Sequence, residues 1–214
     1  MPQPMELRAR EVGPWPMHTY ALVCPVTRQS VLIDPGADAE TLMDLLAESE
    51  PVAILITHTH PDHIGALEEM RARLGVPVMA HPGPHFGDMA LDIDQPLNHG
   101  DEVSVGQHSV RVYHTPGHID DLICFALWDD AGKGDQRVIV GDAVFEGGPG
   151  KTWSTEGFKT TLQNLHNIVL SWSDETVCFP GHGPSFRLGD KRAAIEAFVA
   201  KDHGDFFGDA TWDM

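Results

Sequence analysis

The sequence predicts an α+β sandwich in which two mixed β-sheets lie face to face and helices cover the outer face of each sheet. Two observations predict this class. Short apolar runs typical of strands recur along the chain, and segments with apolar residues three or four positions apart, typical of helices, occur in both halves. A chain of 214 residues fits a single domain over residues 1–214, with a short C-terminal tail at about residues 202–214.

The first half of the chain is expected to alternate strands with helices. The first helix would place Leu42, Leu45 and Leu46 inward, with Asp38 as its N-terminal cap. The second helix would end at Gly75. The predicted strands are residues 19–25, 30–34 and 52–56, and the predicted helices are residues 38–49 and 64–74.

Strands dominate the middle of the chain, and helices return near its end. One late helix is indicated by the spacing of Phe158, Leu162, Leu165, Val169 and Trp172. The other predicted elements are strands at residues 77–80, 102–105, 109–114, 122–128, 137–140 and 176–179, turns at 106–107 and 131–136, and a helix at 190–201.

Charge and composition exclude several classes of partner. The net charge of −18 disfavours binding to nucleic acid or to anionic membranes, and 42% apolar residues are enough for a sizeable core. No window approaches the roughly 18 apolar residues of a membrane span, and the N-terminal segment has no apolar stretch of the signal-peptide kind. Cys24, Cys124 and Cys178 lie far apart in strand-like runs and are expected to be buried thiols. We therefore expect a cytoplasmic protein that binds neither nucleic acid nor membranes.

The strongest functional signal is ITHTHPDHIG, residues 56–65, which follows an apolar strand. His58 and His60 are two positions apart on extended chain, so both rings can point to one side. Asp62 and His63 follow at the start of a helix and can reach a neighbouring point. Four such groups beside a core are costly without a partner, and imidazoles and carboxylates are natural metal ligands. The segment therefore predicts a metal site rather than a solvated loop.

Three later motifs, each at the end of a predicted strand, supply further ligands of the same chemical classes. They are HTPGH, which ends at His118, VGDAVF, which contains Asp142, and FPGHGP, which contains His182. Glycine and proline beside these residues suit tight turns that direct a side chain out of a sheet edge.

In this order the motifs resemble those of the metallo-β-lactamase superfamily of hydrolases. The resemblance implies an αββα sandwich with two divalent metal ions at one sheet edge. Asp34, in LIDPG, matches a family aspartate that supports the site from outside the ligands, and a plain turn residue is the alternative. The implied ligands are three for one ion (His58, His60 and His118), three for the other (Asp62, His63 and His182) and Asp142 as a bridge.

Within the superfamily the sequence is most similar to glyoxalase II, the thioester hydrolase that acts on hydroxyacylglutathione. The similarity lies in GDAVFEGGPGK, residues 141–151. Lys151 and Trp153 fall where that enzyme contacts glutathione, which implies that both bind the substrate. Two features depart from the pattern: Asp120-Asp121 would make the mouth of the site more acidic, and GHGP around His182 also occurs in lactonase-like members.

The chemistry of the predicted ligands fits a hydrolase. Nitrogen and oxygen donors accept zinc, iron or manganese, with zinc as the default. A hydroxide that bridges the two ions would attack a carbonyl carbon, and Asp62 would orient that hydroxide as a catalytic residue. A thiolate leaving group needs little protonation, because a thiol has a pKa of about 8.5. This favours a thioester of a small metabolite as the substrate.

Four alternatives are weighed against this prediction. A lactonase-type ester hydrolase would use the same metal pair, whereas a persulfide dioxygenase would use a single iron. A structural metal domain fits poorly, because structural zinc is normally held by four ligands that include cysteines. A nuclease is opposed by the charge of −18.

The tail carries Phe206, Phe207 and Trp212 among acidic residues and glycines. Such aromatic residues can pack back onto their own domain, cover the site, or reach a second subunit and build a homodimer. The sequence leaves these three roles open.

Overall fold

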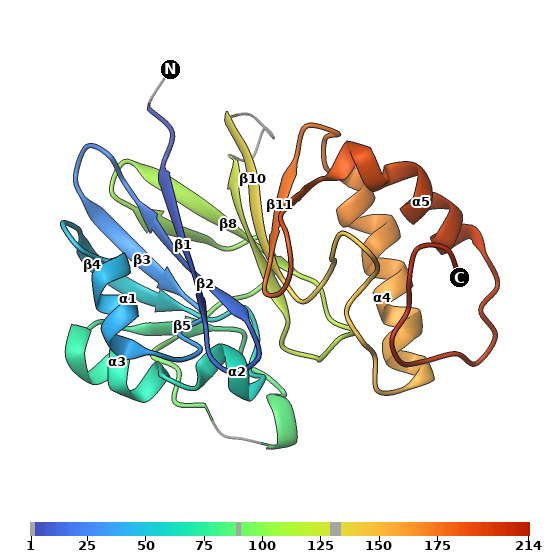
Figure 1. Cartoon of the computed structure of the whole chain (residues 1–214), viewed down its shortest axis with the longest axis horizontal. Coiled ribbons are helices and arrows are strands. Elements are labelled where there is room, and N and C mark those ends of the chain that lie inside the picture. The colour runs from blue at the N-terminus through green and yellow to red at the C-terminus, as the bar shows by residue number, and fades with distance from the viewer. Residues whose placement is uncertain (1–2, 89–90, 129–133) are drawn as a thin grey trace.

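Two mixed β-sheets stack face to face between two layers of helices, as Figure 1 shows. The structure is a computed structural model that describes residues 3–88, 91–128 and 134–214. Helices α1 and α3 pack on the first sheet, and α4 and α5 pack on the second. The predicted αββα sandwich is therefore confirmed.

The first sheet comes from the N-terminal half of the chain, and its strands follow one another in chain order. β1, β2 and β3 pair antiparallel, whereas β3 to β6 pair parallel. Parallel neighbours need crossover connections, and α1 supplies the one between β3 and β4, as the α2–α3 segment does between β4 and β5. The strands are β1 (Glu6–Val12), β2 (Met17–Val23), β3 (Gln29–Ile33), β4 (Glu50–Leu55), β5 (Val78–Ala80) and β6 (Gln95–Pro96), and the helices are α1 (Ala39–Leu45), α2 (Pro61–Ile64), α3 (Leu67–Leu74) and a 3₁₀ turn at Phe86–Asp88.

The second sheet has the strand order β12-β11-β10-β9-β8-β7. Its pairs are antiparallel except for β10 and β11, which are joined through α4. The strands are β7 (Glu102–Val105), β8 (His108–His114), β9 (Ile123–Trp128), β10 (Gly134–Gly141), β11 (Val177–Pro180) and β12 (Phe186–Arg187), and the helices are α4 (Thr155–Asn167), a 3₁₀ turn at Val169–Ser171 and α5 (Leu188–Ala200).

The core has three layers: one between the sheets and one under each helical layer. Strand β9 contributes to two of them, because successive side chains of a strand point to opposite faces. Ile123 and Phe125 lie between the sheets, whereas Cys124 and Ala126 lie under α4 and α5. A strand covered on both faces appears in the sequence as a continuous apolar run. For this reason β9 could be predicted although its apolar and polar residues do not alternate. The three cysteines are buried and free, as expected.

Several local expectations were wrong or incomplete. Strand β1 was not expected, because an edge strand with the sequence ELRAREV is mostly exposed and has no apolar alternation. The second helix is broken into α2 and α3 at Gly65-Ala66. Asp38 does not cap α1: its backbone is left-handed (φ 57°), and its carboxylate accepts a hydrogen bond from the Gly13 N–H instead (3.2 Å). Of the turn expected at 131–136, residues 131–133 lie outside the described residues, and β10 has begun by Gly134.

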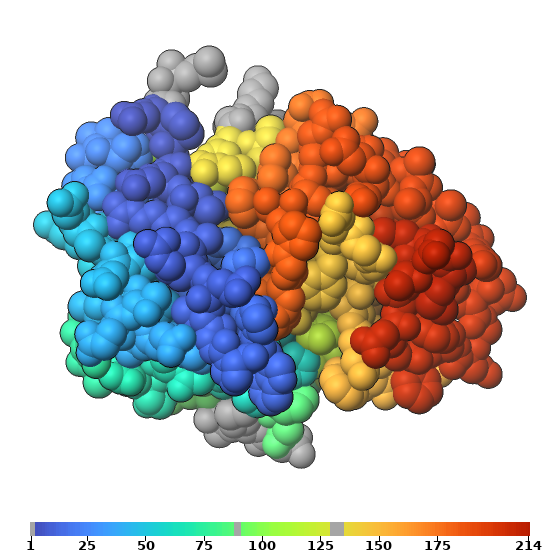
Figure 2. All heavy atoms as spheres, viewed as in Figure 1, coloured from blue at the N-terminus to red at the C-terminus, as the bar shows by residue number. Residues whose placement is uncertain are grey.

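The C-terminal tail packs against the helical side of its own domain, seen in red in Figure 2. The Trp212 ring lies 5.4 Å from the ring of Phe198, and its Nε1 donates to the Glu146 carbonyl (2.9 Å). The Phe206 ring lies 5.0 Å from that of Phe158. Phe207 stays 54% exposed. Packing onto the domain is therefore the role that the structure shows for Phe206 and Trp212. No helix in the described part of the chain has the length and apolarity needed to cross a membrane.

Replacing Trp212 with alanine is expected to lower the free energy of unfolding by about 1–3 kcal/mol, because a partly buried aromatic contact and a hydrogen bond are lost. For a chain of this size that is a fall of several degrees in the melting temperature, measured by circular dichroism. Trp15→Ala is the matched control, since Trp15 is 70% exposed. An unchanged melting temperature for Trp212→Ala would contradict the packing role.

Candidate metal centre

The histidine-rich segment follows β4 of the first sheet and is hydrogen-bonded to the second sheet. After β4 the chain stays extended, and the Thr57 carbonyl accepts a hydrogen bond from the N–H of Ile123 at the start of β9 (2.8 Å). His60 keeps an extended backbone (φ −62°, ψ 142°), and Pro61 then begins α2. Proline at the first helical position has the φ that a helix needs and no N–H left unpaired. This local sequence places His58 and His60 on extended chain and Asp62 and His63 on a helical turn.

The structure brings six of the seven predicted ligands together in two groups of three. Each group offers ligand atoms that lie within 4.8 Å of one another. The groups are His58, His60 and His118, and Asp62, His63 and His182. Another grouping that the geometry permits, Asp34 with His58 and His63, shares members with both.

Asp142, the seventh predicted ligand, lies between the two groups. Its Oδ2 is 3.5 Å from Nε2 of His118 and 3.8 Å from Nε2 of His182. Its Oδ1 is 3.4 Å from Nε2 of His63. Asp142 follows β10 in the second sheet, whereas His63 belongs to the first half of the chain. The centre therefore lies at the seam where the two sheets meet.

Hydrogen bonds from outside the cluster orient three of the imidazole rings. Nδ1 of His63 lies 2.9 Å from Oδ2 of Asp34, Nδ1 of His118 lies 2.7 Å from the Lys151 carbonyl, and Nδ1 of His182 lies 2.8 Å from the Pro16 carbonyl. Oxygen acceptors at these positions place the proton on Nδ1. Nε2 of each ring is then free to bind a metal ion, as is usual for metal-binding histidines.

Two glycines make room for this arrangement. A Cβ at Gly181 would collide with Oδ1 of Asp142 and with the ring of His63. A Cβ at Gly36, in the LIDPG segment, would collide with the backbone carbonyl of Asp62. Only residues without a side chain fit at these approaches, which explains the glycines in LIDPG and FPGH.

The charges of the site suit a cation. Burial lowers the pKa of His58 well below its usual value and that of His60 to about 4, which keeps both rings neutral. Burial acts in the same direction on His63, but its contacts with the carboxylates of Asp142 and Asp34 outweigh burial and raise its pKa to about 10. A positive charge is thus favoured between these two carboxylates, and a metal ion can supply it in place of the proton.

The residues present fit a metal ion. Nδ1 of His60 lies 3.1 Å from Nε2 of His58 and 2.9 Å from Nε2 of His118. Two nitrogens bound to one tetrahedral zinc ion would lie about 3.3 Å apart, given zinc–nitrogen bonds of about 2.0–2.1 Å. Oδ1 of Asp142 is buried and has no hydrogen-bond partner among the described residues. A buried carboxylate oxygen without a partner is costly, and a metal ion would satisfy it.

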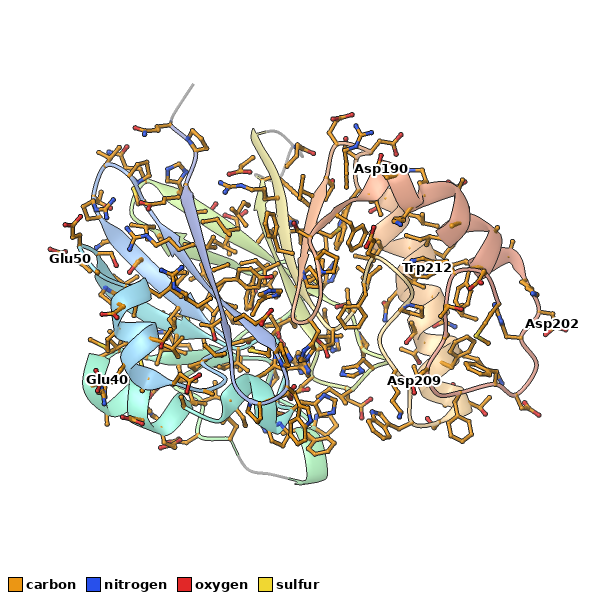
Figure 3. The ribbon with its side chains drawn as sticks, viewed as in Figure 1. Glu40, Glu50, Asp190, Asp202, Asp209 and Trp212 are labelled. Atoms are coloured by element: carbon orange, nitrogen blue, oxygen red, sulfur yellow. The ribbon has the colours of Figure 1, made fainter. Side chains whose placement is uncertain are left out.

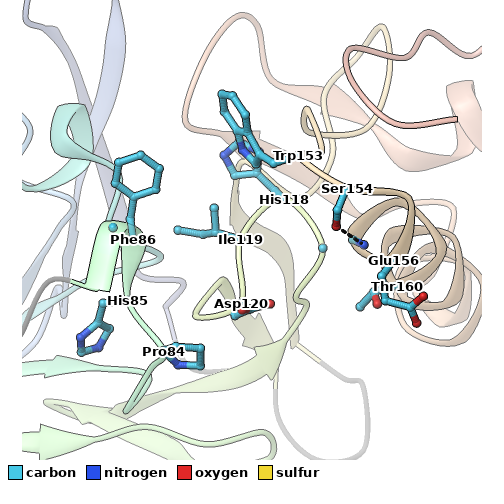
Figure 4. Close-up of a pocket in the computed structure, with 13 residues that line it drawn as sticks. Pro84, His85, Phe86, His118, Ile119, Asp120, Trp153, Ser154, Glu156 and Thr160 are labelled. Carbon is cyan, nitrogen blue, oxygen red and sulfur yellow. Dashed lines mark hydrogen bonds between the residues drawn. The ribbon is translucent and has the colours of Figure 1, made fainter.

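A cavity of about 400 Å³ opens beside His118, as Figure 4 shows. One wall comes from the segment after β5, the floor from the segment after His118, and the other wall from the start of α4. The lining residues are Pro84, His85, Phe86, Gly87, Gly117, His118, Ile119, Asp120, Trp153, Ser154, Glu156, Gly157 and Thr160.

The two predicted substrate contacts are placed differently. Trp153 lines the cavity, and its ring centroid lies 6.3 Å from that of His60. Lys151 is not among the lining residues; its ammonium group lies 3.2 Å from a carboxylate oxygen of Asp209. The expectation that both Asp120 and Asp121 make the mouth acidic needs correction for Asp121, which is buried.

Two positioning residues were missed from the sequence. Oγ1 of Thr59 donates to Oδ2 of Asp121 (2.6 Å) and accepts from the backbone N–H of Phe86 (2.8 Å), which holds one cavity wall against the ligand segment. Thr57 donates through both its backbone N–H and its hydroxyl to Asp34 (2.7 and 2.5 Å). The ITHTH sequence carries both threonines, but their partners come from other segments and could not be inferred from it.

The fold and the ligand arrangement agree with a known family, whose sequence profile matches residues 13–182. The chain belongs to the metallo-beta-lactamase superfamily. Its relatives in the superfamily include the probable metallo-hydrolase YqgX of Bacillus subtilis (strain 168), which is 31% identical over 199 residues, or 84% of this chain and 91% of that protein. The family inferred from the motifs is confirmed, and the chain is a metallo-hydrolase of this superfamily.

A second relative is the hydroxyacylglutathione hydrolase of Hahella chejuensis (strain KCTC 2396), 38% identical over 176 residues. The alignment spans 80% of this chain but 63% of that enzyme. Among solved superfamily structures, ETHE1 from Myxococcus xanthus has a TM-score of 0.79 at 28% identity, covering 92% of this chain and 86% of that one. TTHA1623 in a di-iron-bound form has a TM-score of 0.67 at 28% identity, covering 86% of this chain and 96% of that one.

Replacing Asp34 with asparagine is expected to weaken metal binding by about 10–100-fold, because the ring of His63 loses the carboxylate that orients it. Asparagine tolerates the left-handed backbone of Asp34 (φ 54°), so the change tests the carboxylate and not the turn. Affinity is measured by competition with a chelator of known strength. Asp38→Asn, at an exposed residue with φ 57°, is the matched control. Equal metal affinities for the Asp34→Asn and Asp38→Asn variants would show that the Asp34 carboxylate does not support metal binding.

Proposed function

We propose that the chain hydrolyses thioesters of small metabolites with the help of two divalent metal ions. Zinc is the default metal, and iron or manganese are the alternatives. The observation that carries the proposal is the position of Asp142, whose two carboxylate oxygens lie within 3.8 Å of His63, His118 and His182 and so reach both ligand groups. A carboxylate placed in this way suits a bridge between two ions better than a single-ion site.

The ligands of each ion are assigned from the two groups: His58, His60 and His118 for one, and Asp62, His63 and His182 for the other. Two metal ions held there would lower the pKa of bound water toward about 7 and polarise a carbonyl oxygen.

Asp62 is the chain's own catalytic residue in this proposal. Burial would raise the pKa of its carboxyl group, but the contacts with His182 and His63 and a backbone hydrogen bond together outweigh burial and lower that pKa to about 2. Nε2 of His182 lies 3.1 Å from Oδ2 of Asp62, which places both atoms at the second ligand group. An ionised, oriented carboxylate can accept a hydrogen bond from the attacking water and hold its lone pair toward the substrate carbonyl.

The thioester bond is supported by the likeness to a hydroxyacylglutathione hydrolase and by the ease with which a thiolate leaves. The alignment with this chain spans 63% of that relative, so the similarity supports the type of bond that is cleaved and not the complete substrate of that enzyme. Trp153 is proposed as a substrate contact because it lines the cavity beside His118. Lys151 would act from outside the lining residues, next to Asp209.

A lactonase-type ester hydrolase would use the same residues, so a substrate panel must separate the two. A persulfide dioxygenase would need one iron with two histidines and one carboxylate. The presence of two ligand groups favours hydrolysis over this single-ion chemistry. The number of metal ions bound per chain distinguishes the two functions.

The purified protein is expected to bind about two metal ions per chain, counted by mass spectrometry of the metals, and to hydrolyse thioesters faster than lactones. Asp142→Ala should lose both metal and activity, and the melting temperature should fall because bound metal favours the folded state. Trp15→Ala should keep all three properties. About one iron per chain, together with oxygen uptake when a persulfide is added, would contradict the hydrolase function and support the dioxygenase function. Full metal content in Asp142→Ala would exclude the bridge.

A further inference from the structure

The cavity beside the metal centre is the natural place for the part of the substrate beyond the scissile carbonyl. His118 belongs both to the ligand cluster and to the lining. His60 completes the boundary: its ring lies 4.5 Å from Phe86 and 6.3 Å from Trp153, both lining residues. Nε2 of His60 is buried and has no hydrogen-bond partner among the described residues. A substrate bound at the metal centre would reach this cavity past Phe86 and Trp153.

The charge of this cavity is negative. Asp120 contributes a carboxylate from the floor, and Glu156 contributes one from the first turn of α4 (Figure 4). Neither has an ion-pair partner within the described residues, and no lysine or arginine is among the lining residues that the structure describes. An anionic substrate would meet two carboxylates that have no ion-pair partner, and a cationic one would be attracted by both.

Two positive groups lie near these carboxylates, and each already faces a negative charge. Lys151 lies outside the lining with its ammonium group 4.9 Å from the centroid of the Trp153 ring, and it is paired with Asp209. The N-terminus of α4 carries a partial charge of about +0.5, and the Ser154 hydroxyl already accepts from the N–H of Gly157 there (3.0 Å). Glu156 in the first turn places a full negative charge against that partial positive one.

The cavity surface next to the ligand cluster is apolar and aromatic. Phe86, Ile119 and Trp153 line the part next to the ligand cluster, and the Trp153 side chain is 58% exposed. The faces of aromatic rings attract organic cations, and quaternary ammonium groups are a common ligand of such surfaces. Aromatic rings together with nearby carboxylates favour a cation on an apolar frame over a strongly hydrated ion.

We propose that the cavity selects substrates that carry an ammonium group on an apolar frame beyond the scissile bond, with Asp120 and Glu156 as the specificity-determining residues. The inference rests on the proposed hydrolase function and names the substrate class of the same site. It departs from a glutathione-type substrate, whose carboxylates would face Asp120 and Glu156.

Three thioacetates of nearly equal size test the proposal on the metal-loaded protein. Acetylthiocholine carries a quaternary ammonium, S-(3,3-dimethylbutyl) thioacetate is its neutral isostere, and S-acetyl-3-mercaptopropionate carries a carboxylate. The expected order of kcat/KM is cation, neutral, anion, with a cation-to-anion ratio on the order of tenfold or more at low salt that shrinks as salt is added. Equal values, or a preference for the anion, would overturn the proposal.

The double variant Asp120→Asn/Glu156→Gln is expected to abolish this ratio, mainly by raising KM for the cation, since the lost attraction acts on bound substrate and transition state alike. Asp44→Asn/Glu50→Gln changes the net charge by the same amount at exposed residues outside the cavity lining, and Glu50 lies at the left edge of the molecule in Figure 3. This control should keep the ratio of the wild type. Loss of the ratio in both double variants would assign it to net charge and contradict the proposal.

Direct binding separates this inference from the proposed function. Calorimetric titration of the metal-loaded protein with choline and with 3,3-dimethyl-1-butanol needs no turnover. Choline should bind more tightly to the wild type, and the two ligands should bind alike to Asp120→Asn/Glu156→Gln. If choline is preferred while no thioester is cleaved, the thioesterase function fails and the cation preference stands. If thioesters are cleaved without any charge preference, the hydrolase stands and the role of Asp120 and Glu156 is wrong.

Discussion

The placement of one imidazole between two carboxylates is the constraint on which this structure depends. His63 lies 2.9 Å from Asp34, which follows β3 of the first sheet, and 3.4 Å from Asp142, which follows β10 of the second. All three side chains are buried, so each needs the others or a metal ion to offset the loss of water. Gly181 leaves room for this contact, since a Cβ there would collide with Oδ1 of Asp142 and with the ring of His63.

The layered core explains how such a polar centre can exist in a chain of this size. The apolar layer between the sheets and the two layers under the helices bury most of the large aliphatic and aromatic residues. The polar centre lies beyond the ends of the strands, where turns can deliver side chains without interrupting the ladder of hydrogen bonds. The stability thus comes from the core, and the ends of the strands are left free for chemistry.

The ligand segment and its partners could be predicted from the sequence because their chemistry is local. HTHPDH combines an extended alternation with a proline that starts a helix, and each later ligand stands beside a glycine or proline at the end of a strand. The contacts that could not be predicted are those between distant segments with ordinary sequences. Asp121 looks like its neighbour Asp120, yet one is buried against Thr59 and the other lines the cavity. Strand β1 was missed for the same reason. It is held by its pairing with β2, and its own polar sequence does not indicate that partner.

Both walls of the cavity are hydrogen-bonded to ligand segments. The backbone N–H of Phe86 donates to Thr59, which stands between His58 and His60, and the carbonyl of Lys151 binds the ring of His118. A movement that separates the two walls would strain these hydrogen bonds and so shift the histidine segments. Conversely, histidines held in place by a metal ion would restrict the movement of the walls. If a ligand in the cavity steadies the walls and with them the histidines, it raises the affinity for the metal, and reciprocity requires bound metal to raise the affinity for that ligand by the same factor. A protein of this kind would hold its metal most firmly while substrate is bound.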